Sequence, residues 1–149
     1  MPPATNQARL MMLFLKTGFI VSGLLFAYLA IKLSGQSPQP VNPAFEWAIC
    51  AVAVADDVIG LLYGRKLAGW IRRRAPRNGP LSDPLQVWMV GNMLSLALME
   101  SCTLFGLVLH FVGAGARFAG VLLSIGVLSV IFWSPGNPPA AAEERPFQS

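Results

Sequence analysis

Three carboxylates lie inside long apolar stretches of this chain, where an ionisable group is costly. Asp56 and Asp57 interrupt the second stretch, and Glu100 interrupts the third. A charged residue at the centre of a bilayer costs roughly 2.5 to 17 kcal/mol depending on the method, so such groups usually face a bundle interior or a water-filled cavity. These three residues are therefore the candidates for binding a proton or a cation.

Lys16 is a cation that could neutralise one of the aspartates. At about 1.5 Å per residue, Asp56 and Asp57 lie roughly 10–12 Å from the end of their helix at Gly64, and Lys16 lies roughly 9–11 Å from the same surface. Burying one charge alone costs more than burying a satisfied pair, so we expect Lys16 to pair with Asp56 or Asp57. The alternative is that its ammonium group reaches back to the lipid headgroups.

The two adjacent aspartates point about 100° apart on a helix, so both cannot face one partner. At least one is expected to be protonated or to reach a water-filled crevice, because burial disfavours the charged form. An ion pair that locks helix packing and a role in transport both remain open for this pair.

A polar-edged face runs along most of the third stretch. On a helical wheel Asn92, Thr103 and His110 fall within about 20° of one another, and Glu100 lies roughly 60–80° away. Polar groups facing lipid would lack partners, so this face is expected to meet another helix or water. For Glu100 we favour hydrogen bonding between helices, with a proton- or cation-binding carboxylate as the alternative. We expect His110 to make a polar contact at a helix end.

Residues 97–108 resemble the ion-binding helix of ATP synthase proteolipid (c-type) subunits, in which a membrane carboxylate is followed by small residues and a Gly-Leu pattern. This resemblance implies that Glu100 is a proton carrier. The chain departs from that family because it lacks a glycine-alternating first helix and has a large basic segment. As a whole it more closely resembles an uncharacterised family of small four-span bacterial membrane proteins, through residues 97–101 and 105–109, a likeness that implies no activity.

The composition determines the fold class that must position these residues. Of 149 residues, 54% are hydrophobic and 12% are charged, whereas soluble domains carry roughly 25% charged residues. The apolar runs approach the about 20 residues that cross about 30 Å of hydrocarbon. The sequence therefore predicts an all-α fold, a single integral membrane four-helix bundle. The predicted spans are residues 10–31, 43–64, 85–112 and 118–133.

Helix start and stop signals set these bounds. Asn42 and Asp83 are each followed by proline, as at an N-cap and the first helical position. Gly60 and Gly64 have the spacing that permits close helix approach, although Gly64 could instead end its helix. The segment after the fourth span is rich in proline, and we expect a disordered tail over 135–149.

Basic residues gather on one predicted side of the membrane, mostly in a loop over 65–83. Only Lys32 and Arg117 lie on the other side, so the positive-inside rule puts both termini in the cytoplasm of what we expect to be a bacterial inner membrane. The loop sets topology or, alternatively, docks anionic lipid headgroups or a partner. Nucleic-acid binding is not expected, because aromatic residues are not interleaved with the charges. The candidate headgroup contacts are Arg65, Lys66, Arg72, Arg73, Arg74 and Arg77.

Motifs for catalysis or cofactor binding are missing from the sequence. There is no zinc cluster, phosphate-binding loop or Ser-His-Asp set, so we expect no metal and no cofactor. Cys50 and Cys102 are expected to be free thiols, with a disulfide as the alternative. We predict a protein that is not an enzyme, namely an accessory or scaffold subunit with a membrane protein partner or as a homo-oligomer. The alternatives are a small oligomeric proton or cation channel or carrier using Glu100, and a membrane redox enzyme.

Overall fold

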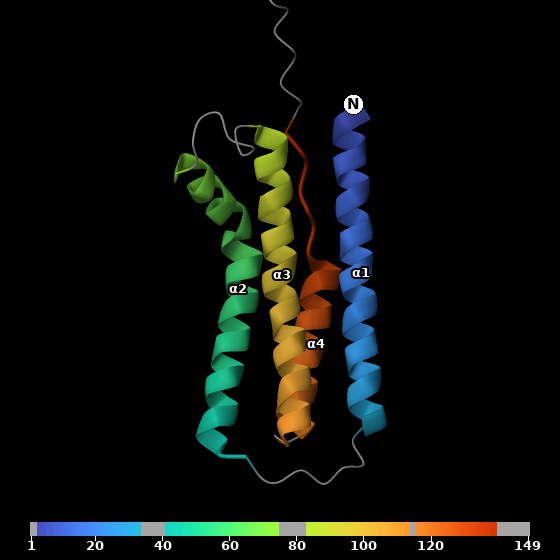
Figure 1. Ribbon diagram of the computed structural model, residues 1–149, viewed down its shortest axis with the longest axis vertical. Coiled ribbons are helices and arrows are strands. Elements are labelled where there is room, and N and C mark those ends of the chain that lie inside the picture. The colour runs from blue at the N-terminus through green and yellow to red at the C-terminus, as the bar shows by residue number, and fades with distance from the viewer. Residues whose placement is uncertain (1–2, 34–40, 75–82, 114–115, 140–149) are drawn as a thin grey trace, which may run out of the picture.

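The chain forms a bundle of four α-helices (Figure 1). The computed structural model describes residues 3–33, 41–74, 83–113 and 116–139, and it has no strand among them. The prediction of an all-α fold with four helices is confirmed. In Figure 1, α4 lies behind α3, and α1 and α2 flank this pair. The helices are α1 (Pro3–Leu33), α2 (Pro43–Arg74), α3 (Pro84–Val112) and α4 (Ala116–Phe132).

The predicted capping residues begin two of the helices. The backbone N–H of Ala44 donates to the side-chain oxygen of Asn42 at 2.9 Å, and the N–H of Leu85 donates to Asp83 at the same distance. At the other end of α3, Gly113 adopts a left-handed conformation with φ of 98°. A residue with a Cβ is strained at this angle, so glycine is the suitable residue to end the helix there.

α2 extends further than expected. The helix continues to Arg74, so residues 65–74 of the predicted basic loop are helical. Gly64 does not end the helix; it packs against Ser95 of α3 instead. The Lys, Leu, Ala and Arg residues that follow it favour helix, so α2 continues. Figure 1 shows that this last part of α2 bends away from α3. Residues 75–82 of the predicted loop lie outside the described residues.

α4 is much shorter than its neighbours. It has 17 residues, or about 25 Å, whereas the other three have 29 to 32 residues, or more than about 40 Å. After Phe132 the chain continues without helical structure in the direction of α4, along the bundle toward the end that carries the N-terminus (Figure 1). Residues 135–139 of the predicted disordered tail have no helical structure and lie beside the helices (Figure 1). Residues 140–149 lie outside the described residues.

α3 is the central helix. It packs against α1, α2 and α4, and two buried apolar clusters form around it. One cluster joins Cys102 and Leu109 to Leu122 of α4, and the other joins Leu96 and Met99 to Trp133, which directly follows α4. The non-helical segment is thus anchored by a buried tryptophan, because burial of a large aromatic side chain is strongly favourable.

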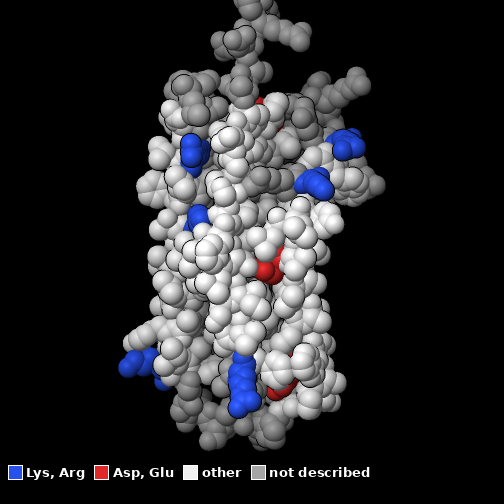
Figure 2. All heavy atoms as spheres, turned by 180° about the vertical axis from the view of Figure 1, so that it is seen from behind, with Lys and Arg blue, Asp and Glu red and all other residues white. Residues whose placement is uncertain are grey.

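The outer surface of the bundle is apolar. Phe14, Ile31 and Phe132 are each at least 75% exposed. Figure 2 shows one face that is mostly white between its two ends, with Lys and Arg concentrated toward those ends. Two helical stretches, Asn6–Lys32 and Pro84–Val112, are long and apolar enough to cross a membrane. A contiguous exposed apolar surface of this size is typical of proteins that contact lipid or a membrane partner.

Candidate functional site

Each of the three carboxylates accepts a hydrogen bond from a serine of another helix. The Ser101 hydroxyl of α3 lies 3.2 Å from Asp56 of α2, and it shares its single proton with the carbonyl of Leu98 in its own helix, which is 2.6 Å away. Ser129 of α4 donates to Asp57 of α2 at 2.8 Å, and Ser22 of α1 donates to Glu100 of α3 at 2.9 Å. The three contacts connect α2 to α3, α2 to α4 and α1 to α3, so together they link all four helices near the middle of the bundle. We call these six residues the carboxylate–serine belt.

Two of the belt carboxylates are buried. Asp57 is 4% exposed and Glu100 is 6% exposed, whereas Asp56 is half-buried. Among the described residues no Lys, Arg or His forms an ion pair with any of the three. The second oxygen of Asp57, Oδ1, is buried and has no hydrogen-bond partner within the described part of the chain. Asp57 therefore combines burial with an unused acceptor, which is a costly arrangement for an ionised group.

Lys16 has a different partner from the one expected. Its ammonium group donates to the carbonyl oxygens of Ile131 and Trp133, both at 2.7 Å. The predicted ion pair with Asp56 or Asp57 is not formed in the structure. The last carbonyls of a helix have no partners within it, and the helix dipole makes this end partially negative. Because α4 ends partway along the length of α1, its last carbonyls lie within reach of Lys16, which serves as their cap.

The polar face of α3 is directed into the bundle. Asn92 and Thr103 are fully buried. Asn92 donates to the carbonyl of Trp88 at 2.7 Å, one turn earlier in the same helix. The Asn92 side-chain oxygen and the Thr103 hydroxyl have no hydrogen-bond partner among the described residues. The expectation that this face meets other helices holds for both residues, although neither makes a side-chain hydrogen bond to another helix.

His110 lies apart from this group. It is half-buried near the C-terminal end of α3, and its ring packs edge-on against Phe111 with centroids 5.8 Å apart. No described residue is hydrogen-bonded to its ring nitrogens. The predicted polar contact at a helix end is therefore not formed within the described part of the chain.

Glycines bring the helices close enough for the belt to form. A Cβ atom on Gly60 would lie 2.9 Å from the carbonyl oxygen of Ser95, and one on Gly64 would collide with the Ser95 side chain. On the other side of α3, a Cβ on Gly126 would lie 2.8 Å from the backbone nitrogen of Thr103. The Gly60–Gly64 spacing thus mediates close approach of α2 to α3, and Gly126 does so between α3 and α4.

Sequence reasoning did not identify the serines of the belt. Ser22 and Ser129 each stand in an apolar helical stretch, and Ser101 directly follows Glu100; a serine inside such a helix needs a hydrogen-bond acceptor when buried. A serine can also satisfy itself on a carbonyl of the preceding turn, as Ser95 and Ser124 do and as Ser101 does in addition to its contact with Asp56. The signal for a belt serine was therefore present in the sequence but did not distinguish the two uses.

The remaining predicted residues form no further cluster. Cys50 and Cys102 are free, and the Cys102 thiol contacts the carbonyl of Leu122 at 3.6 Å. Of the basic residues, Lys66 and Arg73 are exposed, and Lys66 lies 5.4 Å from the ring centroid of Tyr63. The backbone of Arg65, Arg72 and Arg74 is helical, and Arg77 lies outside the described residues.

The belt can hold helices together and can hold a proton or a small cation on a carboxylate. It has no nucleophile–base pair, and the described residues contain no group of three His, Cys, Asp or Glu residues that could bind a metal ion. Comparisons with protein families, with curated proteins and with solved structures found no match to this chain.

Proposed function

We propose that this chain is an integral membrane protein whose four helices all cross the bilayer of a bacterial inner membrane, with both termini in the cytoplasm. The apolar outer surface supports this location. The arrangement of cations supports the orientation, since Arg9, Lys66 and Arg73 lie at one end of the helices and only Lys32 and Arg117 lie at the other within the described residues.

In this membrane the protein acts as a non-catalytic accessory or scaffold subunit of a larger assembly. The observation that carries this proposal is the carboxylate–serine belt, in which every intramembrane carboxylate is engaged with a second helix. Polar contacts of this kind stabilise helix association in a membrane. They fix the shape of the bundle and leave its outer apolar surface available to a membrane partner.

Purification from native membranes in mild detergent tests the scaffold role. The tagged chain is expected to bring down a membrane protein in a fixed stoichiometric ratio. The control is the same purification after a high-detergent wash, which removes loosely associated proteins. A homogeneous oligomer of this chain alone, with no other protein in fixed ratio, would contradict the proposal.

A second candidate function is a proton or cation carrier that uses the belt carboxylates. It is favoured by one observation, the buried Asp57 oxygen that has no donor within the described residues. A proton or a small cation bound there would satisfy this oxygen and remove the cost of an unpaired charge. Glu100 would be the second group of such a path, because it is buried in the same belt.

Proton flux into liposomes distinguishes the two functions. A carrier loses flux in Glu100→Gln and Asp57→Asn while the variants remain folded, because the amides keep the shape but cannot exchange a proton. A scaffold shows no flux above empty liposomes in the unchanged protein, and its amide variants still bind the partner. Lys66→Gln, at an exposed position, is the matched control for charge removal.

The basic end of α2 is proposed to contact anionic lipid headgroups. The segment 65–74 is helical and ends the long second helix. Each Lys or Arg near an anionic surface contributes about 1 kcal/mol of attraction. This contact would hold the bent end of α2 against the cytoplasmic surface of the bilayer.

A further inference from the structure

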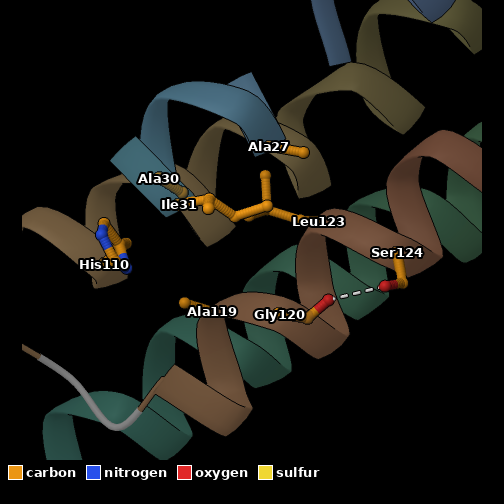
Figure 3. Close-up of a pocket in the computed structure, with 8 residues that line it drawn as sticks. All are labelled: Ala27, Ala30, Ile31, His110, Ala119, Gly120, Leu123 and Ser124. Carbon is orange, nitrogen blue, oxygen red and sulfur yellow. Dashed lines mark hydrogen bonds between the residues drawn. The ribbon is translucent and has the colours of Figure 1, made fainter. Parts of the chain in front are cut away.

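A cavity of about 300 Å³ opens between α1, α3 and α4 at the end of the bundle opposite the N-terminus. Figure 3 shows that its walls come from one stretch of α1 and one stretch of α4, with His110 of α3 at one end. The lining residues are Ala27, Ala30, Ile31, His110, Ala119, Gly120, Leu123 and Ser124. Most of this lining is apolar. We call this cavity the α1–α4 groove.

The groove has real space for a ligand at Gly120. A Cβ added to Gly120 would meet no atom within 4 Å, whereas at Gly106 and Gly126 of the same α3–α4 region it would clash with the neighbouring helix. Helix packing therefore does not require a glycine at position 120. Because Gly120 has no side chain, the groove stays open at this position.

Of the two polar side chains that line the groove, one already makes a hydrogen bond within its helix and the other does not. The Ser124 hydroxyl donates to the carbonyl of Gly120 at 2.8 Å, so it is satisfied within its own helix. His110 has no hydrogen-bond partner among the described residues and can donate to a ligand. The groove therefore suits an apolar chain with a polar group at one end.

A cation begins α4, the helix that forms one wall of the groove, although it is not itself a lining residue. Arg117 is exposed and precedes Gly120 by three residues and Ser124 by seven, which puts the three on one side of α4. It also lies in the first turn of α4, where unpaired backbone N–H groups favour an anion. Lys32 is also at this end, but it follows Ile31 directly and lies over the ring of Tyr28, which is not among the lining residues.

We propose that the α1–α4 groove binds one anionic phospholipid of the outer leaflet, with an acyl chain between α1 and α4 and the phosphate on Arg117 and His110. This inference rests on the proposed membrane location and goes beyond the proposed scaffold role. The charge in the first turn of α4 argues for a phosphate headgroup, because a guanidinium group binds phosphate through two parallel hydrogen bonds. A second copy of this chain would offer no anion at this end among its described residues other than Glu46.

Lipid retention after detergent purification tests the proposal. The probe is the lipid itself: the purified chain is washed in detergent, and bound phospholipid is identified by native mass spectrometry after incubation with mixed phosphatidylglycerol and phosphatidylethanolamine. The unchanged protein is expected to retain one phosphatidylglycerol per chain. Gly120→Leu, whose Cβ would meet no atom within 4 Å, puts a side chain at the groove wall and should abolish retention.

Arg117→Gln is the second variant, and it does not depend on the packing at Gly120. Loss of a charge-assisted hydrogen bond worth about 1.5–3 kcal/mol weakens lipid binding by about tenfold or more. The matched controls are Gly18→Leu, at a glycine of α1 that also has open space, and Lys32→Gln, which removes a cation at the same end. Both controls are expected to retain the lipid.

Three results would overturn the inference: equal retention in Gly120→Leu and the unchanged protein, equal retention of neutral and anionic lipid, or equal loss in the two controls. Extraction of the membranes with alkaline carbonate separates this failure from failure of the proposed location. A chain that stays in the carbonate-washed membrane but keeps its lipid in Gly120→Leu refutes the groove alone. A chain that is released by carbonate refutes the membrane location and the groove together.

Discussion

Lys16 shows how a single side chain can connect the first and last helices. Its two hydrogen bonds to the end of α4 are both 2.7 Å long. Lys16→Met keeps the length of the side chain and removes the donor, leaving the two carbonyls without this partner. We expect a loss of roughly 2–4 kcal/mol in the free energy of unfolding, measured by SDS titration in mixed micelles.

Two control variants make this loss specific to the contact. Lys16→Arg should recover most of the stability, since a guanidinium group also donates to carbonyl oxygens. Lys66→Met, at an exposed position, should change the free energy of unfolding by less than about 0.5 kcal/mol. If Lys16→Met is as stable as the unchanged protein, the ammonium group does not support the end of α4.

The belt predicts energetic coupling between Ser22 and Glu100. A double-mutant cycle with Ser22→Ala and Glu100→Gln should give a coupling energy of roughly 0.6–1.7 kcal/mol, the range for hydrogen bonds inside membrane proteins. The measurement is the free energy of unfolding in micelles for the four proteins of the cycle. Ser124→Ala combined with Glu100→Gln should be additive, because Ser124 bonds within its own helix.

At the level of residues, the sequence predicted which side chains are unusual but not what they contact. The cost of a buried charge is visible in a one-dimensional pattern, and Asp57 and Glu100 are indeed buried. The partner of Lys16 depends on where α4 ends relative to α1, and that is set by three-dimensional packing. Carbonyl acceptors at a helix end are present in every sequence and carry no residue-specific signal.

At the scale of the helices, the contact between α2 and α3 depends on glycines, which have no side chain to keep the two helices apart. Gly64→Ala places a methyl group against Ser95, so α2 must move away from α3. We expect a loss of about 1–3 kcal/mol in the free energy of unfolding, measured by the same SDS titration. Gly69→Ala on the same helix has open space and should be neutral or stabilising by up to about 1 kcal/mol, because alanine favours helix. Equal effects at the two positions would argue against close packing at Gly64.

The helix bounds differ in how well local signals defined them. α3 occupies 84–112 against an expectation of 85–112, because Asp83 and Gly113 are strong local caps. α2 exceeds its expected end by ten residues, since a glycine can either end a helix or pack against its neighbour. Only the position of α3 decides between these two uses.

For the whole molecule, the proposed topology can be tested by accessibility from the two sides of the membrane. Single cysteines are placed at Lys32→Cys and Lys66→Cys in a chain whose Cys50 and Cys102 are changed to serine. In intact cells without an outer membrane barrier, a membrane-impermeant thiol reagent should label position 32 and leave position 66 unlabelled. Permeabilised cells should label both.

The two positions control for one another, since both are exposed lysines in the C-terminal part of helices that run in opposite directions. Labelling of position 66 in intact cells would reverse the orientation. Labelling of both would contradict a location on opposite sides of the membrane. Composition supports membrane embedding, but it says nothing about partners, because the outer apolar surface suits lipid and protein equally.

The dependence of the α4 end on Lys16 has a consequence for synthesis. The acceptors of Lys16 lie 115 and 117 residues later in the chain. At about 5–20 residues per second, the ribosome needs roughly 6–23 s to reach them. During this interval the ammonium group of the first helix lacks these two acceptors and, in the proposed membrane location, must remain hydrated or at the headgroups. α1 can already pack on α3 and bond Glu100 through Ser22 by then, but its contact with the end of α4 forms only when the last helix is complete.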